Sequence, residues 1–169
     1  MKDSERMRVG LVLERHRIDH PWQEHNWRAV AVVPGAEDIA APRLIAEGED
    51  WQRYHLATLD IEVHRGETEG YRFNLSQARP VVYALWRLAD EDPSARPEPF
   101  HVTVCPHEAQ DYLDGGDVVV EGVAMPEAVA LWLAGYVARH HVDAPFEKRK
   151  RKPHPDGKGR EPVAEDELG

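Results

Sequence analysis

The chain has very little cysteine. Cys105 is the only cysteine among 169 residues. A single thiol cannot form an internal disulfide, and it cannot supply the several sulfur ligands of a structural zinc site. The composition therefore argues against a disulfide-stabilised secreted domain and fits the reducing conditions of the cytoplasm.

Long hydrophobic runs are also missing. The longest apolar stretch, Val123 to Ala138, contains Glu127 and is shorter than the roughly 20 residues that cross a bilayer. The N-terminal residues combine charged side chains with a short apolar stretch and no small-residue cleavage site, so we expect no secretory signal. These absences predict a cytoplasmic protein without a membrane span.

Basic residues are the minority, with 21 Lys and Arg against 31 Asp and Glu and a net charge of -10. Nucleic-acid binding depends on lysine and arginine replacing counterions along the phosphates, so the acidic body predicts no nucleic-acid partner. The one basic run, Lys148 to Lys152, lies near several prolines and glycines. We interpret it as part of a solvated tail, with contact to nucleic acid or an acidic partner as the alternative.

The length and the 41% hydrophobic content are enough for one core and too small for two ordinary domains. We expect a flexible N-terminus over residues 1–6 and a single domain over residues 7–146. The remaining residues, 147–169, contain almost no apolar side chains and are expected to form a disordered charged tail.

Alternation of apolar and polar residues predicts strands through the first two thirds of the chain. A polar loop is expected over residues 16–26, and a turn with a short strand is one interpretation of residues 66–76. The apolar run 81–88 indicates a central strand that is covered on both faces. The expected strands are residues 7–13, 27–33, 52–56, 59–63, 81–88, 100–104 and 118–121.

Two helices are predicted in the C-terminal third, because each begins with proline near its first turn. They cover Pro106 to Leu113 and Pro126 to about His141. Leu131 lies off the apolar stripe of the second helix, so part of that helix could form a partner surface, with the core as the alternative. Strands followed by helix, strand and helix predict an α+β domain with a largely antiparallel, curved or barrel-like sheet.

Ten histidines raise the question of a metal site, and His16, His20 and His25 lie within one expected loop. Pro21 would interrupt a helical zinc pair, and no HExxH motif is present. Three loop histidines are easily solvated, so these residues are weak candidates and we expect no metal or other cofactor.

Cys105 stands just before a predicted helix, where the helix dipole could lower the pKa of a thiol. A catalytic thiolate also needs a base within hydrogen-bond reach, and neighbouring residues rarely point at one another. We therefore interpret Cys105 as a small buried thiol and predict no catalytic residue. The phosphate-binding glycine loop, the GxSxG elbow and the dinucleotide fingerprint are all missing.

Aromatic side chains in polar surroundings suggest protein contacts, because such residues are frequent anchors in interfaces. The segment 66–76 either closes a local turn or forms a polar rim around Tyr71 that recognises a partner. The candidate partner-contact residues are Trp22, Trp27, Glu67, Glu69, Tyr71, Asn74, Tyr112, Leu131 and Trp132.

Six segments together resemble an uncharacterised bacterial family, a domain of unknown function found mainly in proteobacteria. The genes of that family often neighbour those of respiratory, molybdenum-containing formate dehydrogenases and their iron–sulfur and chaperone partners. The resemblance covers about Met7 to Arg151. The segments are ERHRIDHPWQ (14–23), WRAVAV (27–32), HRGETEGYRFNLS (64–76), VTVCPHEAQDYLD (102–114), MPEAV (125–129) and RHHVDAPFEKRKR (139–151).

The resemblance implies a non-catalytic accessory protein in the maturation or assembly of a formate dehydrogenase. Such a protein would bind a dehydrogenase subunit or another maturation factor, and the family supplies no catalytic residues. Two alternatives stay open: a small-ligand or cofactor-binding sensor module, and an enzyme that uses Cys105 or the histidines.

Overall fold

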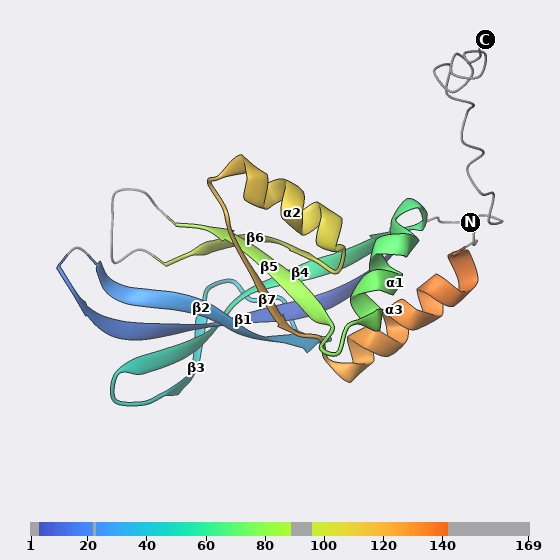
Figure 1. The fold of residues 1–169 in the computed structure, drawn as a ribbon. Coiled ribbons are helices and arrows are strands. Elements are labelled where there is room, and N and C mark those ends of the chain that lie inside the picture. Colours follow the sequence, from blue (N-terminus) through green and yellow to red (C-terminus); the bar gives the residue numbers. More distant parts are fainter. Residues whose placement is uncertain (1–3, 22, 89–95, 142–169) are drawn as a thin grey trace, which may run out of the picture.

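The computed structural model describes residues 4–21, 23–88 and 96–141 (Figure 1). None of the helices in this described part of the chain has the length and apolar content of a membrane span. The elements are β1 (Ser4–His20), β2 (Gln23–Pro34), β3 (Arg43–Glu47), β4 (Trp51–His64), a 3-10 turn (Arg65–Glu67), α1 (Thr68–Ser76), β5 (Val81–Arg87), β6 (Glu98–Thr103), α2 (Pro106–Gly115), β7 (Val119–Ala124) and α3 (Glu127–His140).

The strands form two antiparallel sheets, ordered β2-β1-β4-β3 and β6-β5-β7. The sheets face each other, with β4 close to β6 and β2 close to β7, so they form a barrel-like sandwich. At the second of these seams, the backbone N–H of Ala29 donates a hydrogen bond of 2.7 Å to the carboxylate of Glu121. The predicted α+β class, with a largely antiparallel sheet and two helices in the C-terminal third, is confirmed.

Curvature enters the first sheet through two bulges at the same level of β1. Val30 is the extra residue in β2, and Leu56 is the extra residue in β4. A bulge bends its strand and increases the local twist. Beyond the bulges, the β1–β2 hairpin projects past the second sheet (Figure 1).

The two ends of the sandwich differ. At one end, α1 and α3 lie side by side, and the buried rings of Tyr71 and Tyr136 pack edge to face at 6.3 Å between centroids. At the other end lies the projecting β1–β2 hairpin (Figure 1). Helix α2 covers the outer face of the second sheet, where Ala109 and Leu85 are buried.

Two expectations for the first sheet are wrong. Residues 16–26 are largely strand, because β1 runs on to His20 and β2 begins at Gln23. Backbone pairing continues there although most of the side chains are polar. The two expected strands 52–56 and 59–63 are one strand, β4. The bulge at Leu56 shifts the apolar alternation by one residue and makes one strand resemble two.

Three further differences follow from the same sheet and from α1. Residues 66–76 form a short turn and helix α1, because the buried positions Thr68, Tyr71 and Asn74 recur every three residues. Strand β1 begins at Ser4, opposite His64, within the segment expected to be flexible.

Strand β3 is absent from the expected strands, since most of its residues are exposed and carry no apolar alternation. The expected tail, 147–169, lies outside the described residues.

The buried side chain of Asn74 connects α1 to the second sheet. Its amide nitrogen donates to the carbonyl oxygens of Val81 and Val104 at 2.8 and 2.9 Å. Its amide oxygen accepts a hydrogen bond of 3.1 Å from the backbone N–H of Val81. One side chain therefore satisfies two backbone groups at the start of β5 and one just after β6.

Replacing Asn74 with alanine should lower the free energy of unfolding by about 3 kcal/mol, because buried backbone groups lose their partners. Urea unfolding measures this change. Asn26→Ala, at an exposed position in β2, is the control and should change the free energy of unfolding by less than about 0.5 kcal/mol. Equal urea midpoints for the two variants would contradict the assigned role.

Candidate functional site

On the inner face of β1, buried apolar side chains give way to arginines toward the β1–β2 hairpin. The alternate residues that precede this point are buried in the core: Val9, Leu11 and Leu13. Because side chains two residues apart share a strand face, Arg15 and Arg17 continue the same face. The core of the sandwich therefore leads directly into a cationic surface on one strand.

Arg15 is half-buried and held in place by its neighbours on β2 and β4. Its Nε donates a hydrogen bond of 2.9 Å to Oε1 of Gln52, and its Nη2 lies 3.4 Å from the hydroxyl of Tyr54. Its guanidinium carbon lies 5.7 and 5.6 Å from the ring centroids of Trp27 and Tyr54. Arg96, just before β6, places a second guanidinium 4.9 Å from the Tyr54 ring.

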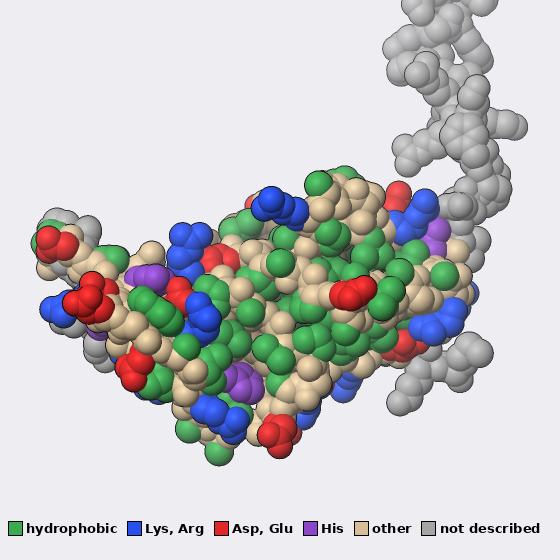
Figure 2. Space-filling model, turned by 90° about the horizontal axis from the view of Figure 1, so that it is seen from below, with side chains coloured by type: hydrophobic (Ala, Val, Ile, Leu, Met, Phe, Trp, Pro, Cys, Tyr) green, Lys and Arg blue, Asp and Glu red, His purple; other side chains and the backbone are tan. Residues whose placement is uncertain are grey.

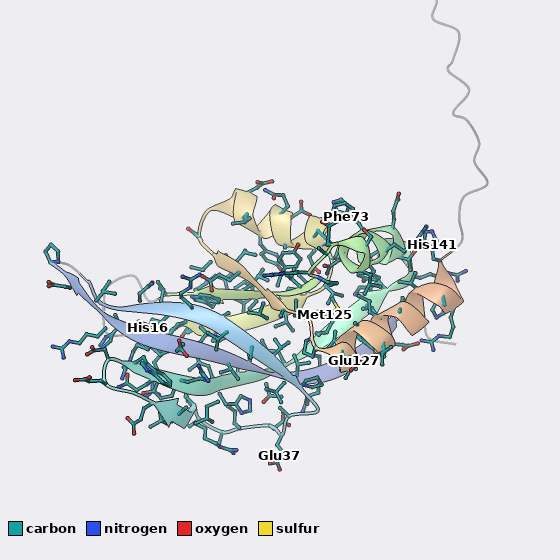
Figure 3. All side chains as sticks on the ribbon, turned by 60° about the horizontal axis from the view of Figure 1, so that its bottom comes forward. His16, Glu37, Phe73, Met125, Glu127 and His141 are labelled. Atoms are coloured by element: carbon teal, nitrogen blue, oxygen red, sulfur yellow. The ribbon has the colours of Figure 1, made fainter. Side chains whose placement is uncertain are left out.

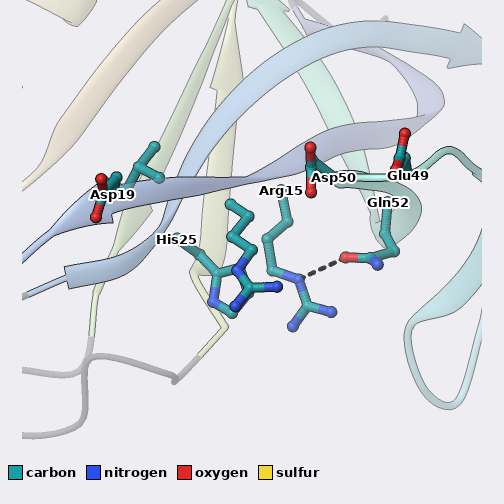
Figure 4. Close-up of a pocket in the computed structure, with 8 residues that line it drawn as sticks. Arg15, Asp19, His25, Glu49, Asp50 and Gln52 are labelled. Atoms are coloured by element: carbon teal, nitrogen blue, oxygen red, sulfur yellow. Dashed lines mark hydrogen bonds between the residues drawn. The ribbon is translucent and has the colours of Figure 1, made fainter.

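A hollow of about 420 Å³ opens beside Arg15. Figure 4 shows the side chains of Arg15 and His25 pointing to the same side of β1, with Gln52 hydrogen-bonded to Arg15. Glu49 and Asp50 lie on the turn between β3 and β4 and border the hollow. The lining residues come from β1, β2, the β3–β4 turn and β4: Arg15, Arg17, Ile18, Asp19, His25, Glu49, Asp50 and Gln52.

The opposite face of the same strands carries a closed ion-pair cluster. Both Nε and Nη2 of Arg53 donate to one carboxylate oxygen of Glu14, at 2.8 and 2.5 Å. His16 bonds the other oxygen at 2.6 Å. Burial acts to raise the pKa of Glu14, but the hydrogen bonds from Arg53 and His16 outweigh it and the pKa is lowered. This cluster is internally satisfied and stabilises the sheet.

The three histidines considered for a metal do not share a site in the described structure. His16 pairs with Asn26 and His25 pairs with Arg17, so the two side chains lie on opposite faces of the sheet. The side chain of His20 lies outside the described residues. No group of three or more His, Cys, Asp or Glu side chains in the described ranges could hold a metal ion.

The segment that suggested a polar recognition rim instead packs into the core. Tyr71 is 1% exposed, and its hydroxyl accepts a hydrogen bond of 2.9 Å from the backbone N–H of His64. Asn74 is equally buried in the contacts described above. Burial takes both residues out of the set that a partner could contact in this fold. Glu69 remains exposed on α1.

Cys105 is a buried thiol, as its sequence context predicts. Its Sγ donates a hydrogen bond of 3.1 Å to Oε1 of Glu67, so this candidate contact residue is engaged within the fold. Burial raises the pKa of Cys105 to about 11, and the hydrogen bond to Glu67 acts in the same direction. A raised pKa favours the protonated thiol at neutral pH, and the protonated form is much less reactive than the thiolate.

The start of α2 is joined to β6 by a carboxylate network. Glu108 accepts a hydrogen bond of 2.6 Å from the hydroxyl of Thr103 and lies 2.9 Å from Nε2 of His101. The contact with His101 lowers the pKa of Glu108. The candidate contact residue Tyr112 packs against Phe100 and His101, both at 5.7 Å between ring centroids. These contacts fasten α2 onto the second sheet.

Helix α3 presents an apolar surface outward. Val129, Leu133 and Tyr136 are buried, whereas Leu131 is 66% exposed and Trp132 is half-buried. Between Glu127 and Arg139 the helix contains no charged residue. Hydrophobic side chains gather over α3 in Figure 2. At the C-terminal end of the helix, His141 lies beside α1 (Figure 3) and contacts Thr68 at 2.9 Å.

The candidate contact residues thus differ in whether a partner could reach them. Leu131 is exposed on α3, whereas Trp132 is partly buried and packs against the core. Trp27 is buried beneath Arg15. Trp22 and the basic run Lys148 to Lys152 lie outside the described residues. Sequence reasoning missed Arg15, Gln52, Tyr54 and Arg96. Continuing the alternation of β1 beyond Leu13 would have placed Arg15 on the core face.

The raised pKa of Cys105 predicts slow alkylation. At about pH 8, folded protein should react with iodoacetamide at least about a hundredfold more slowly than protein unfolded in urea, because the thiolate is the reacting form. The folded rate should increase as the pH approaches 11, the pKa of the buried thiol. Measuring the rates by mass spectrometry tests this, and equal rates in both states would contradict it.

Comparison with known proteins identifies a family for most of the chain. No curated protein and no solved structure matches the chain. A family model described as "Protein of unknown function (DUF3305)" matches residues 8–150. The match spans both sheets and all three helices of the described structure. The chain therefore belongs to the DUF3305 family.

Proposed function

We propose that this protein is a non-catalytic accessory factor that acts by binding another protein. The observation that carries the proposal is the outward face of α3. A helix that is apolar all round is normally buried, because each exposed apolar group costs free energy in water. Leu131, at 66% exposure, is the largest departure from that rule in α3. A partner protein that covers α3 would remove this surface from water.

The proposed process is maturation or assembly of a respiratory formate dehydrogenase. Support for this finer assignment comes from the six sequence segments and the gene neighbourhood of the family they resemble. The partner would be a dehydrogenase subunit or another maturation factor, bound in the cytoplasm before export or cofactor insertion. The buried, protonated thiol of Cys105 supports a binding role over thiol catalysis.

A gene deletion tests the assignment to this process. Cells without the gene should lose formate dehydrogenase activity when grown with formate, while an unrelated molybdoenzyme keeps its activity. Activity should return when the wild-type gene is supplied on a plasmid. Unchanged formate dehydrogenase activity in the deletion strain would refute the assignment to this enzyme.

Leu131→Glu tests the α3 surface directly. The change places a charge within the apolar face, so capture of formate dehydrogenase subunits from cell extract should fall at least about tenfold. Leu113→Glu is the matched control, because Leu113 is also an exposed helical leucine but lies on α2. Both variants should unfold within about 0.5 kcal/mol of the wild type. Equal capture by Leu131→Glu and the wild type would exclude α3 as the contact surface.

A second candidate function is a small-ligand or cofactor-binding module. The hollow beside Arg15 favours it, because it combines oriented polar groups with nearby aromatic rings. The mouths of barrel-like folds are frequent places for such sites. A bound ligand would raise the unfolding temperature in proportion to its concentration above its dissociation constant.

A further inference from the structure

Arg15 lacks the carboxylate partner that three nearby arginines have. On β1, Arg6 pairs with Glu62, and Arg8 pairs with Asp38 and Asp60. On β4, Arg53 pairs with Glu14. Arg15 has no carboxylate partner among residues 4–21, 23–88 and 96–141, although the chain has a net charge of -10. Its charge is held by a neutral amide and aromatic rings.

The surroundings of Arg15 fix its direction without neutralising it. Gln52 occupies Nε, and the rings of Trp27 and Tyr54 flank the guanidinium. Glu49 and Asp50 border the same hollow, but neither forms an ion pair with Arg15. A half-buried charge loses part of its hydration, and an opposite charge at short range offsets that cost. An anion in the hollow would supply this opposite charge.

A second cation strengthens the same location. Arg96 contacts the Tyr54 ring that also contacts Arg15, and it has no ion pair with the described residues. Arg17 lines the hollow from the same strand face as Arg15. Two further positive charges therefore lie near the oriented guanidinium, from β1 and from the segment before β6. These positive charges attract an anion, whereas the carboxylates of Asp19, Glu49 and Asp50 in the lining oppose a highly charged one.

We propose that this hollow binds a carboxylate group, with Arg15 as its principal partner. Gln52 engages Nε, and the Tyr54 hydroxyl lies 3.4 Å from Nη2, so Nη1 and the second hydrogen of Nη2 are left to face the ligand. Two carboxylate oxygens match these two donors. A carboxylate is favoured over phosphate because Asp19, Glu49 and Asp50 also line the hollow and would repel a second negative charge. The inference gives the second candidate function its ligand chemistry and is independent of the α3 surface.

The carboxylate belongs either to a free organic acid or to an acidic side chain of a bound polypeptide. Isothermal titration of the full chain with acetate, benzoate and a blocked glutamate peptide separates these sources. Inorganic phosphate at matched ionic strength tests the choice of anion. Saturable binding should be seen with at least one carboxylate probe at concentrations up to about 10 mM. The probe that binds most tightly identifies the source.

Arg15→Gln should weaken binding of that probe at least about tenfold, because it removes the charge and the paired donors. Arg6→Gln is the matched control: it removes one positive charge from the outer side of the same strand and should change affinity less than about twofold. Arg15→Lys keeps the charge and loses the two-nitrogen edge, so it should also bind more weakly than the wild type.

Three outcomes would overturn the inference: no saturable carboxylate binding, equal affinity for the wild type and both Arg15 variants, or tighter binding of phosphate. The Leu131→Glu variant should bind the carboxylate probe normally, because Leu131 lies on α3 and does not line the hollow. Failure of the carboxylate site can therefore be distinguished from failure of the α3 surface.

Discussion

Strand β1 is hydrogen-bonded on both sides, to β2 and to β4, and this double pairing positions the rest of the molecule. The paired bulges at Val30 and Leu56 bend both neighbours at the level where the core of β1 ends. On one side of that level, the inner face of β1 supports the second sheet and the helices. On the other side, the same face carries Arg15 beside the hollow. A shift of one residue would turn Arg15 outward and expose Leu13.

The two surfaces proposed for binding lie on different parts of this scaffold. The apolar face belongs to α3, which packs with α1 at one end of the sandwich. The Arg15 hollow lies toward the β1–β2 hairpin at the other end. Each depends on a different force, since burial of apolar area serves α3 and charge pairing serves Arg15. A protein with both could hold a partner through α3 while a carboxylate is recognised elsewhere.

Sequence patterns predicted the elements that have a continuous apolar run or a proline at the start of a helix. Strand β5 is central in its sheet, as its continuous apolar run indicates, and both helices that begin with proline are present. Prediction failed where the backbone departs from regular alternation. The bulge at Leu56 divided the pattern of β4, and Tyr71, Phe73 and Leu75 gave α1 the appearance of a strand. Exposed strand β3 has no such pattern, because pairing with β4 alone defines it.

The candidate sites were less accessible to prediction than the fold. Leu131 could be assigned to an outward face, because helical spacing separates it from the core positions of α3. Tyr71 and Asn74 could not be recognised as core residues without the helix that buries them. Arg96 and Tyr54 are 42 positions apart in the sequence, and their contact depends on the meeting of the two sheets. A contact between residues this far apart in the sequence leaves no local motif that could predict it.

The carboxylate of Glu121 lies beside the edge strand β2, where a further strand could otherwise pair. By accepting the N–H of Ala29, it satisfies a donor on the open edge of β2. Unpaired edge donors invite a foreign strand to extend a sheet, which leads to swapping or fibril growth. A charged side chain at this position repels such an intruder and removes one of the hydrogen bonds it would need. The hydrogen bond from Ala29 to Glu121 thus makes this edge position of β2 less available to a foreign strand.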